Sequence, residues 1–352
     1  MRRPRSASLA LLVLVAGAAC TGDTKGGSDT VPPSSSGGAD LTGAGATFPN
    51  PLYTKWFDSY ARSSGVKINY QSIGSGGGIR QFTQGTVDFG ASDGPMTDEQ
   101  LTQVGGPVLH VPTILGAVVI TYNMAGATGP LTFDAATITD IYLGKLIKWN
   151  DPRLAALNPG VALPGTDIIV VHRSDGSGTT YVFTDYLSKV SAEWKQKVGV
   201  ATAVSWPVGL GGKGNEGVTQ QVKQTEGAIG YVERVYATEN KLPVALLRNA
   251  AGNAVEPSLK AVTAAAASVA IGPESDFRVS ITNAPGADAY PISSFTWLLV
   301  HPDKLNDDKG RKLKAFLDWM LTPEAQRLAA DLQYAPLPVT LIETLQARLA
   351  KL

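Results

Sequence analysis

Three loops of the chain combine glycines with serine or threonine hydroxyls where a strand pattern gives way to a helix pattern. They span Gly43–Pro49, Gly74–Gly78 and Asp175–Thr179. The first N–H groups of a helix have no intrahelical partner and lie at the positive end of the helix dipole, and glycines let a ligand approach them closely. Each loop could therefore bind an anion without a formal positive charge. One such loop alone indicates only a cap or a turn, whereas three in one chain favour a shared ligand.

Two charged residues accompany these loops. Asp93 follows a predicted strand within the segment Asp88–Pro95, and Arg173 ends the strand that leads into the third loop. A guanidinium group is a planar fork of donors that matches two oxygens of a tetrahedral oxyanion. Taken alone, Asp93 is a cap or turn residue and Arg173 is a surface ion-pair partner. Asp175 either pairs with Arg173 or serves only in its own Asp-Gly turn.

The elements that must position these loops alternate along the chain. Short β-branched runs predict strands at Val66–Tyr70, Val87–Phe89, Val118–Tyr122, Ile168–Val171, Ala228–Val232 and Trp297–Val300. Helical spacing lies between them; Thr322 followed by Pro323 predicts the start of one helix, and Thr97 with Gln100 predicts a capping box at another. This alternation indicates an α/β fold with parallel sheets.

The composition is that of a globular protein of about two domains. The 352 residues are 43% hydrophobic and 17% charged, with 30 basic and 30 acidic side chains. Three arginines and no acid lie in the first 20 residues, so the remainder carries 27 basic and 30 acidic side chains. This balance disfavours nucleic acid as a partner, and an anion would have to be bound by local dipoles and not by bulk positive charge.

The first 20 residues predict an export signal that is not part of the fold. A basic start is followed by the apolar run Leu9–Val15, which is too short to span a bilayer, and by the small residues Gly17–Ala19 before a cleavage point. No later stretch approaches 18 uninterrupted apolar residues, so no other segment is expected to cross a membrane.

Cys20 is the only cysteine of the chain and cannot form an intramolecular disulfide. The segment Val15–Cys20 resembles a bacterial lipoprotein signal, although Gly17 stands where such signals usually have leucine or valine. The resemblance implies a lipid on Cys20 and a protein anchored to the outer face of the cell membrane, or a periplasmic one if the signal is an ordinary one. Residues 21–40, rich in Gly, Ser, Thr, Pro and Asp, predict a flexible tether with a reach of about 25 Å.

One motif suggests a nucleotide site. Gly209–Gly214 has the spacing G-x-G-x-x-G, and Glu233 follows about 20 residues downstream. Pro207 disfavours the strand that should precede such a motif, because proline cannot donate to a sheet. The motif therefore gives only a weak indication of dinucleotide binding.

A phosphatase is an enzyme alternative, because it too must hold an anion, but the sequence offers few residues for its chemistry. The three histidines, His110, His172 and His301, are isolated, no metal-ligand spacing is present, and no base accompanies Ser177. We expect the histidines to be structural. An adhesive surface protein would explain the signal and the tether but not the loops.

At these loops the sequence resembles the periplasmic phosphate-binding proteins that feed the phosphate-specific ABC transporter. The matching segments are Leu41–Asn50, Ile73–Gly78, Val87–Pro95, Val171–Thr180, Trp206–Gly217 and Gly227–Glu233. The resemblance covers nearly all of residues 41–350, and the motifs occur in the family's order and near its spacing.

The resemblance implies a periplasmic-binding-protein-like (type II) fold, with two α/β lobes joined by two crossover strands and the ligand in the cleft. Lobe I would be discontinuous, with residues 41–117 plus 295–352, and lobe II would comprise residues 118–294. The crossings would lie at Val111–Asn123 and Ala289–His301.

The resemblance also implies a set of phosphate ligands. They are Thr47, Phe48, Ser75, Asp93, Arg173, Ser177, Gly178 and Thr179. Arg173 would bind two oxygens, and Asp93 would accept the proton that phosphate keeps near neutral pH and that sulfate lacks. A site built around such a buried hydrogen bond can reject an analogue without it by roughly 10⁴ to 10⁵ fold.

The implied function is capture of inorganic phosphate and its delivery to the permease and ATPase subunits of a phosphate ABC transporter. We expect no catalysis, no cofactor and no metal, and we expect the protein to be a monomer. Two alternatives stay open at this stage: a phosphatase-like surface enzyme, and a protein that binds another tetrahedral oxyanion.

Overall fold

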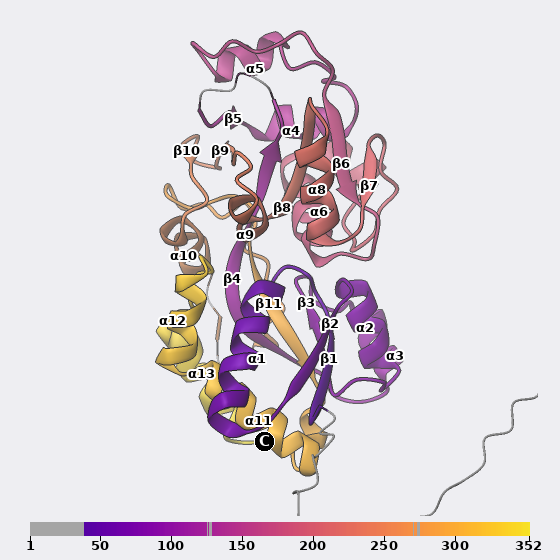
Figure 1. The fold of residues 1–352 in the computed structure, drawn as a ribbon, viewed down its shortest axis with the longest axis vertical. Coiled ribbons are helices and arrows are strands. Elements are labelled where there is room, and N and C mark those ends of the chain that lie inside the picture. Colours follow the sequence, from indigo (N-terminus) through magenta and orange to yellow (C-terminus); the bar gives the residue numbers. More distant parts are fainter. Residues whose placement is uncertain (1–38, 125, 127–128, 270, 273–274) are drawn as a thin grey trace, which may run out of the picture. The chain divides into compact units, whose positions relative to one another are not determined.

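The computed structural model describes residues 39–352 apart from 125, 127, 128, 270, 273 and 274 (Figure 1). The predicted export signal, Cys20 and residues 21–38 of the predicted tether lie outside the described residues. Within the described ranges, no helix has both the length and the apolar character needed to cross a bilayer.

The first half of the main sheet carries the first two loops. Its strands, in spatial order, are β2 (Ile68–Ser72), β1 (Leu41–Gly45), β3 (Phe89–Ser92), β11 (Ser293–Val300) and residues 109–117 of β4 (Leu109–Tyr122). β1 pairs in parallel with β2 and β3, while β11 is antiparallel to both β3 and β4. We call these strands the first sheet half.

β4 continues into the second sheet half. Its residues 118–122 pair with β8 (Ala228–Glu233), which is followed in space by β6 (Ile169–Arg173) and β7 (Leu210–Gly212). All 14 residues of β4 and all eight of β11 are buried, so both strands form the core that connects the halves. A separate small sheet contains β10 (Ala254–Val255), β9 (Leu246–Arg248) and β5 (Thr132–Phe133).

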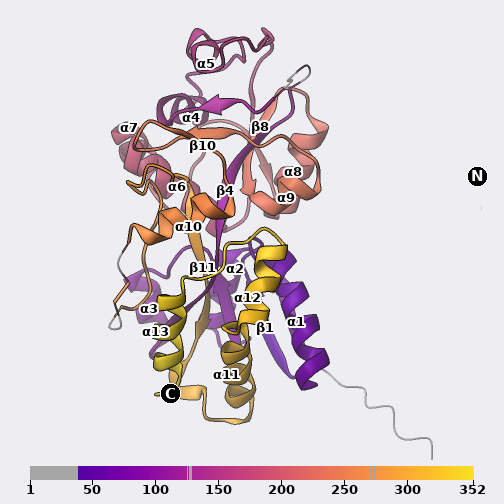
Figure 2. The same cartoon turned by 90° about the vertical axis from the view of Figure 1, so that its left-hand side faces the viewer.

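Helices flank each sheet half (Figures 1 and 2). Around the first half lie α1 (Asn50–Ser64), α2 (Ser75–Thr83), α3 (Asp98–Val104), the 3₁₀ turn η1 (Pro302–Lys304), α11 (Asp308–Met320), α12 (Pro323–Asp331) and α13 (Val339–Leu349). The chain between β4 and β11 contains α4 (Ala135–Tyr142), α5 (Pro152–Leu157), α6 (Gly178–Val190), α7 (Ala192–Lys197), α8 (Gly214–Gln224), α9 (Arg234–Glu239) and α10 (Leu259–Ala267).

The helix α1 illustrates how the core fixes a loop. It ends at Ser64 and is capped by Gly65, whose φ of +78° suits glycine, and its aromatic face is buried. Tyr60 packs on Phe316 of α11 with ring centroids 5.3 Å apart, and Trp56 Nε1 donates to the Ala325 carbonyl of α12 at 2.8 Å. The loop that precedes α1 is therefore anchored by a helix that packs firmly on the first sheet half.

All six strands predicted from β-branched runs are present, but each has other limits than predicted, by one or two residues in β2, β6 and β8 and by four at the start of β11. β4 begins at Leu109 and not at Val118, and β3 runs from Phe89 to Ser92, past the end of the predicted run. The capping box of Thr97 with Gln100 is confirmed, as is the cap of Thr322 on α12.

In the small sheet, β9 is parallel to β5 and antiparallel to β10. In the main sheet, the prediction of parallel strands is right for four pairings and wrong for three. The antiparallel ones, β3 with β11, β11 with β4 and β4 with β8, all involve β4 or β11. β11 lies within the crossing expected at Ala289–His301, and β4 overlaps the one expected at Val111–Asn123 but begins two residues earlier. They carry the chain from one half to the other, so no returning helix forces them to be parallel. The boundaries of the two predicted lobes stay a prediction.

Candidate anion-binding site

Each of the three predicted loops leads into a helix, as expected. α1 begins at Asn50, α2 at Ser75 and α6 at Gly178. The loops follow β1, β2 and β6, so they lie at the carboxyl ends of parallel strands, where α/β proteins commonly bind ligands. Gly74, the cap of α2, has a φ of +86° that other residues rarely adopt.

The second and third loops touch each other across the two sheet halves. The N–H of Gly76 donates to the carbonyl of Gly176 at 2.9 Å. A Cβ added to Gly178 would lie 2.4 Å from Ser75 Oγ and 2.5 Å from Asp93 Oδ2, closer than real Cβ contacts allow. Glycine at position 178 therefore permits the close approach of the two halves, and the described structure is a closed one.

All eight residues predicted to bind phosphate are buried. Close contacts bring Ser75, Asp93 and Gly178 together. Thr47 and Thr179 are joined to the same cluster through hydrogen bonds described below. The role of the eight residues in binding phosphate stays a prediction.

Backbone donors at these helix ends are unused. Among the described residues, no acceptor pairs with the N–H groups of Phe48, Ser75, Gly178 and Thr179. Ser177 caps α6, since its Oγ accepts from the N–H of Thr180 at 3.0 Å, which leaves the hydroxyl hydrogen of Ser177 for another acceptor. Buried N–H groups are nearly always paired in proteins, so this cluster of free donors is suited to an anion.

Asp93 contributes a carboxyl group whose two oxygens have different surroundings. Oδ1 accepts from Thr296 Oγ1 at 2.8 Å, whereas Oδ2 is buried and has no partner among the described residues. Burial raises the pKa of Asp93 to about 7, although the hydrogen bond from Thr296 and the charge of Arg173 both act to lower it. The free oxygen adjoins Gly178, so it is available to a ligand at the start of α6.

Arg173 is buried, and Asp175 holds its guanidinium group. Nε and Nη2 donate to the two carboxylate oxygens of Asp175 at 2.8 and 2.5 Å, and Nη1 donates to Thr179 Oγ1 at 3.3 Å. Of the two roles considered for Asp175, pairing with Arg173 is confirmed. Burial acts to raise the pKa of Asp175, but the hydrogen bonds and charge of Arg173 outweigh it, and the pKa lies below its usual value.

Sequence reasoning missed Asn215, which joins the first loop to the third. Its Nδ2 donates to Thr47 Oγ1 at 2.7 Å and to Thr179 Oγ1 at 3.1 Å, and its Oδ1 accepts from the N–H of Glu233 at 2.9 Å. Thr296, the partner of Asp93, was missed too. Asn215 lies inside the segment Trp206–Gly217 that supported the family resemblance, and this was the one available signal.

The glycine motif at 209–214 has a different role from nucleotide binding. The strand β7 lies within the motif, not before it, and α8 begins at Gly214. The N–H of Gly214 donates to Asp175 Oδ1 at 2.9 Å, and the N–H of Asn215 donates to Thr47 Oγ1 at 3.3 Å. These amides are therefore occupied by residues that support the candidate site.

The three histidines pack against aromatic side chains or bond to the backbone. His110 Nε2 accepts from the N–H of Met96 at 3.1 Å, and burial lowers its pKa to about 4. His172 stacks on Trp206, and His301 stacks on Phe82. These contacts agree with the structural role that we expected for the three side chains.

Fold and site together define a two-part α/β binding protein with an anion site at converging helix ends. A model of the PBP superfamily domain matches residues 30–324. The phosphate-binding protein PstS of Xylella fastidiosa is 45% identical over 330 residues, which cover 93% of this chain and 90% of that protein. PstS of Methanocaldococcus jannaschii is 41% identical over 301 residues, covering 79% and 77% of the two chains.

A solved structure agrees with this assignment at the level of the fold. The phosphate-binding protein of Stenotrophomonas maltophilia superposes with a TM-score of 0.65 at 19% identity, covering 89% of this chain and 94% of that one. The chain belongs to the PBP superfamily and, within it, to the family of the phosphate-binding protein PstS. The family resemblance and the predicted fold class are thereby confirmed.

Proposed function

We propose that this chain captures inorganic phosphate and delivers it to an ABC-type phosphate importer. The observation that carries the proposal is the free oxygen of Asp93 beside unused N–H groups at the starts of α2 and α6. Donors alone would suit any oxyanion, whereas a buried acceptor among them suits an oxyanion that still carries a proton. Membership of the PstS family supports the same ligand.

The proposed chemistry assigns a role to each side of the ligand. Phosphate oxygens accept from the N–H groups and hydroxyls of the three loops and from Arg173, and the phosphate O–H donates to Asp93 Oδ2. Sulfate has no proton at neutral pH, so its oxygen would face the lone pairs of Asp93 and leave that buried acceptor unpaired. Discrimination therefore depends on a missing hydrogen bond and not on size.

The charge of Arg173 is already balanced by Asp175 before any ligand binds. The anion would therefore be held chiefly by oriented dipoles, in line with the net charge of the chain beyond residue 20. The pair also fixes the orientation of the fork, because the two bonds to Asp175 allow the guanidinium plane little rotation.

Calorimetric titration tests the proposal. The purified chain without its first 20 residues is stripped of ligand and titrated with phosphate and then with sulfate. We expect one phosphate site per chain and no heat from sulfate. Binding of sulfate, or of neither anion, would contradict the assignment of Asp93 and redirect the search to other oxyanions.

We further propose an exported monomer that is anchored through lipid on Cys20 and works with permease and ATPase subunits, without catalysis. Lobes of residues 41–117 plus 295–352 and of 118–294 would close on phosphate. Mass spectrometry of the membrane-extracted chain tests the anchor, since Cys20→Ser should abolish the lipid adduct and release the protein. A lipid-free native chain would reject the anchor and leave phosphate binding untouched.

A further inference from the structure

Behind the first loop lies a second buried carboxyl group, Glu233. It ends β8 and caps α9, where its Oε2 accepts from the N–H of Val235 at 2.9 Å. Its side chain is fully buried, and Oε1 has no hydrogen-bond partner among the described residues. An ionised carboxylate in this position would be buried without the partners that normally compensate a charge.

The contact between Glu233 and Tyr334 reaches the first loop. Tyr334 Oη lies 2.8 Å from the carbonyl oxygen of Phe48 and 3.1 Å from Glu233 Oε2. A tyrosine hydroxyl has one hydrogen, and a carbonyl oxygen can only accept. When that hydrogen goes to Phe48, the contact with Glu233 joins two oxygens and needs another hydrogen, which Glu233 must supply.

We infer that Glu233 is a neutral carboxylic acid in the closed structure, donates to Tyr334, and positions the Phe48 loop, so that phosphate capture is coupled to uptake of a proton at Glu233. The inference rests on the proposed function and concerns its regulation. Glu233 acts through Tyr334 and is a positioning residue, with no direct contact to the ligand.

Neighbouring contacts show that this cluster links the two sheet halves. Tyr236 on α9 donates from its hydroxyl to the carbonyl of Thr47, and Arg234 Nη1 donates to Gln333 Oε1 at 2.9 Å. Each bond joins the start of α9 to a segment beside the first half. Opening of the halves would break these bonds and admit water to Glu233, which lowers the cost of ionising it.

Four ionisable groups surround Glu233, but burial has the largest effect on its pKa. They are Tyr334, Tyr236 and Arg234, with Glu216 of α8 placed 3.2 Å from the Tyr236 hydroxyl. Burial raises the pKa of Glu233 well above its usual value, and the hydrogen bond from the N–H of Val235 and the charge of Arg234 only partly oppose it. The guanidinium of Arg234 is turned to Gln333, and Glu216 adds negative charge to the region.

The sign of the coupling follows from this shift. A carboxyl whose closed-state pKa exceeds its open-state pKa favours closure fully below the open-state pKa, and the advantage fades as the pH rises to the closed-state value. Phosphate affinity should therefore fall with rising pH by a factor that Glu233→Gln lacks, because glutamine is always neutral.

The test compares phosphate dissociation constants of the full chain, Glu233→Gln and Glu239→Gln by calorimetry from about pH 5.5 to 8.5. The titrations of phosphate and of Asp93 affect both chains equally, so they cancel when the dissociation constant of the unsubstituted chain is divided by that of the variant. For Glu233→Gln we expect the dissociation constant of the unsubstituted chain, divided by that of the variant, to rise with pH by up to about tenfold per pH unit. A pH-independent factor is added, because an amide nitrogen that donates to Tyr334 cannot also accept from the N–H of Val235. For the control Glu239→Gln, which alters an exposed carboxyl group at the far end of α9, we expect a constant ratio.

A ratio for Glu233→Gln that is constant with pH would overturn the inference while leaving the proposed function intact. Absence of phosphate heat in every chain would instead reject the proposed function. If Glu233→Gln does not fold, the inference can still be tested on the unsubstituted chain. Infrared spectra of this chain, labelled with carboxyl-¹³C glutamate, should show the isotope-shifted C=O band of a protonated glutamic acid when phosphate is bound. Loss of that band at neutral pH would equally overturn the inference.

Discussion

The two sheet halves contribute opposite chemistry to the candidate site. The second half supplies Arg173, a cation whose charge is already matched by Asp175 through two short hydrogen bonds. The first half supplies Asp93, an acid with one oxygen bound by Thr296 and the other without a partner in the described part of the chain. One charged group is therefore complete before the ligand arrives, and the other is not.

This difference separates orientation from selection. A paired guanidinium has a fixed plane and can orient any tetrahedral oxyanion, protonated or not. An unpaired buried carboxyl is stabilised only by a ligand that donates a hydrogen. The first half should therefore decide which anion binds, and the second half should decide how tightly and in which orientation it is held.

The largest expected effect comes from Asp93→Asn, which removes the group in the first sheet half that should select the anion. The amide can present a donor where the carboxyl presented an acceptor, so sulfate loses its penalty and phosphate loses its hydrogen bond. We expect the phosphate-to-sulfate affinity ratio, about 10⁴ or more in the unsubstituted chain, to fall by at least about 10³-fold. Calorimetry with both anions measures this ratio.

The matched control for that experiment is Asp58→Asn, an exposed carboxylate paired with Arg62 on α1. It should leave both affinities unchanged. A phosphate-to-sulfate ratio that survives in Asp93→Asn would show that selection lies elsewhere in the site.

Arg173→Lys alters the orienting side and should have the next largest effect. Lysine keeps the charge beside Asp175 but replaces a planar fork with a point charge, so bidentate bonds to the ligand are lost. We expect phosphate to bind about 100-fold more weakly, while the ratio of phosphate to sulfate affinity changes little. Calorimetry measures both values.

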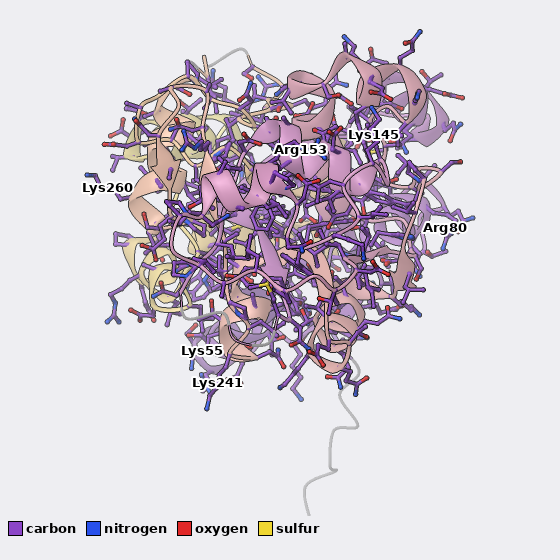
Figure 3. All side chains as sticks on the ribbon, turned by 90° about the horizontal axis from the view of Figure 1, so that it is seen from above. Lys55, Arg80, Lys145, Arg153, Lys241 and Lys260 are labelled. Carbon is purple, nitrogen blue, oxygen red and sulfur yellow. The ribbon has the colours of Figure 1, made fainter. Side chains whose placement is uncertain are left out.

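Arg153→Lys serves as the control, because Arg153 is an exposed arginine paired with Asp140 and Asp151 (Figure 3). Its substitution should not alter phosphate binding. An unchanged dissociation constant in Arg173→Lys would remove Arg173 from the ligand set.

The sequence predicted the parts of the site that belong to one segment each. The loop ending in Gly178 and Thr179 could be found because glycines and hydroxyls at a helix start have a local physical meaning. The α/β fold followed from alternating patterns, and the family resemblance supplied the two-lobed arrangement. Pairing of Arg173 with Asp175 was one of two local options that spacing alone left open.

Contacts between distant segments were the part that the sequence could not supply. Asn215, Thr296 and Tyr334 act through partners about 35 to 290 residues away in the chain, and no local pattern marks them. The antiparallel pairings of β4 and β11 were missed for the same reason, because strand direction depends on the path between the halves. A buried unpaired oxygen, such as that of Asp93, is also a property of packing and not of residue type.

The unpaired acid should also lower the stability of the phosphate-free chain. Burial raises the pKa of Asp93 to about 7 from an ordinary value of 3.8, so its contribution to stability is lost as the pH rises between these values. Asp93→Asn removes the buried charge. We expect its advantage in unfolding free energy over the unsubstituted chain to grow by about 3 kcal/mol from about pH 4.5 to pH 8.

Urea unfolding of both chains at the two pH values measures that difference. A pH-independent difference would indicate that Asp93 is solvated when phosphate is absent. Addition of phosphate to the unsubstituted chain should reverse the order at pH 8, since a bound ligand stabilises only the folded state.

Asn215→Ala tests the hydrogen bonds that join the first loop to the third, and it should reduce phosphate affinity less than Arg173→Lys does. The hydroxyls of Thr47 and Thr179 would lose a shared donor, and both loops would become less fixed. We expect phosphate affinity to fall about tenfold without a change in the phosphate-to-sulfate ratio. Lys213→Ala, an exposed neighbour, is the control. A large change in selectivity would mean that Asn215 contacts the ligand directly.

The smallest effect should be that of salt. Because Arg173 is buried and paired, and the other donors are neutral, no exposed cluster of cations contributes to the proposed site. Exposed cations such as Lys55, Arg80, Lys241 and Lys260 are directed outward at the periphery (Figure 3). Screening acts mainly on exposed charges, so we expect phosphate affinity to change less than about threefold between about 0.05 and 0.5 M sodium chloride. Calorimetry at both salt concentrations measures this change. A larger loss of phosphate affinity with salt would mean that long-range attraction by exposed cations, and not the helix ends, contributes most to binding.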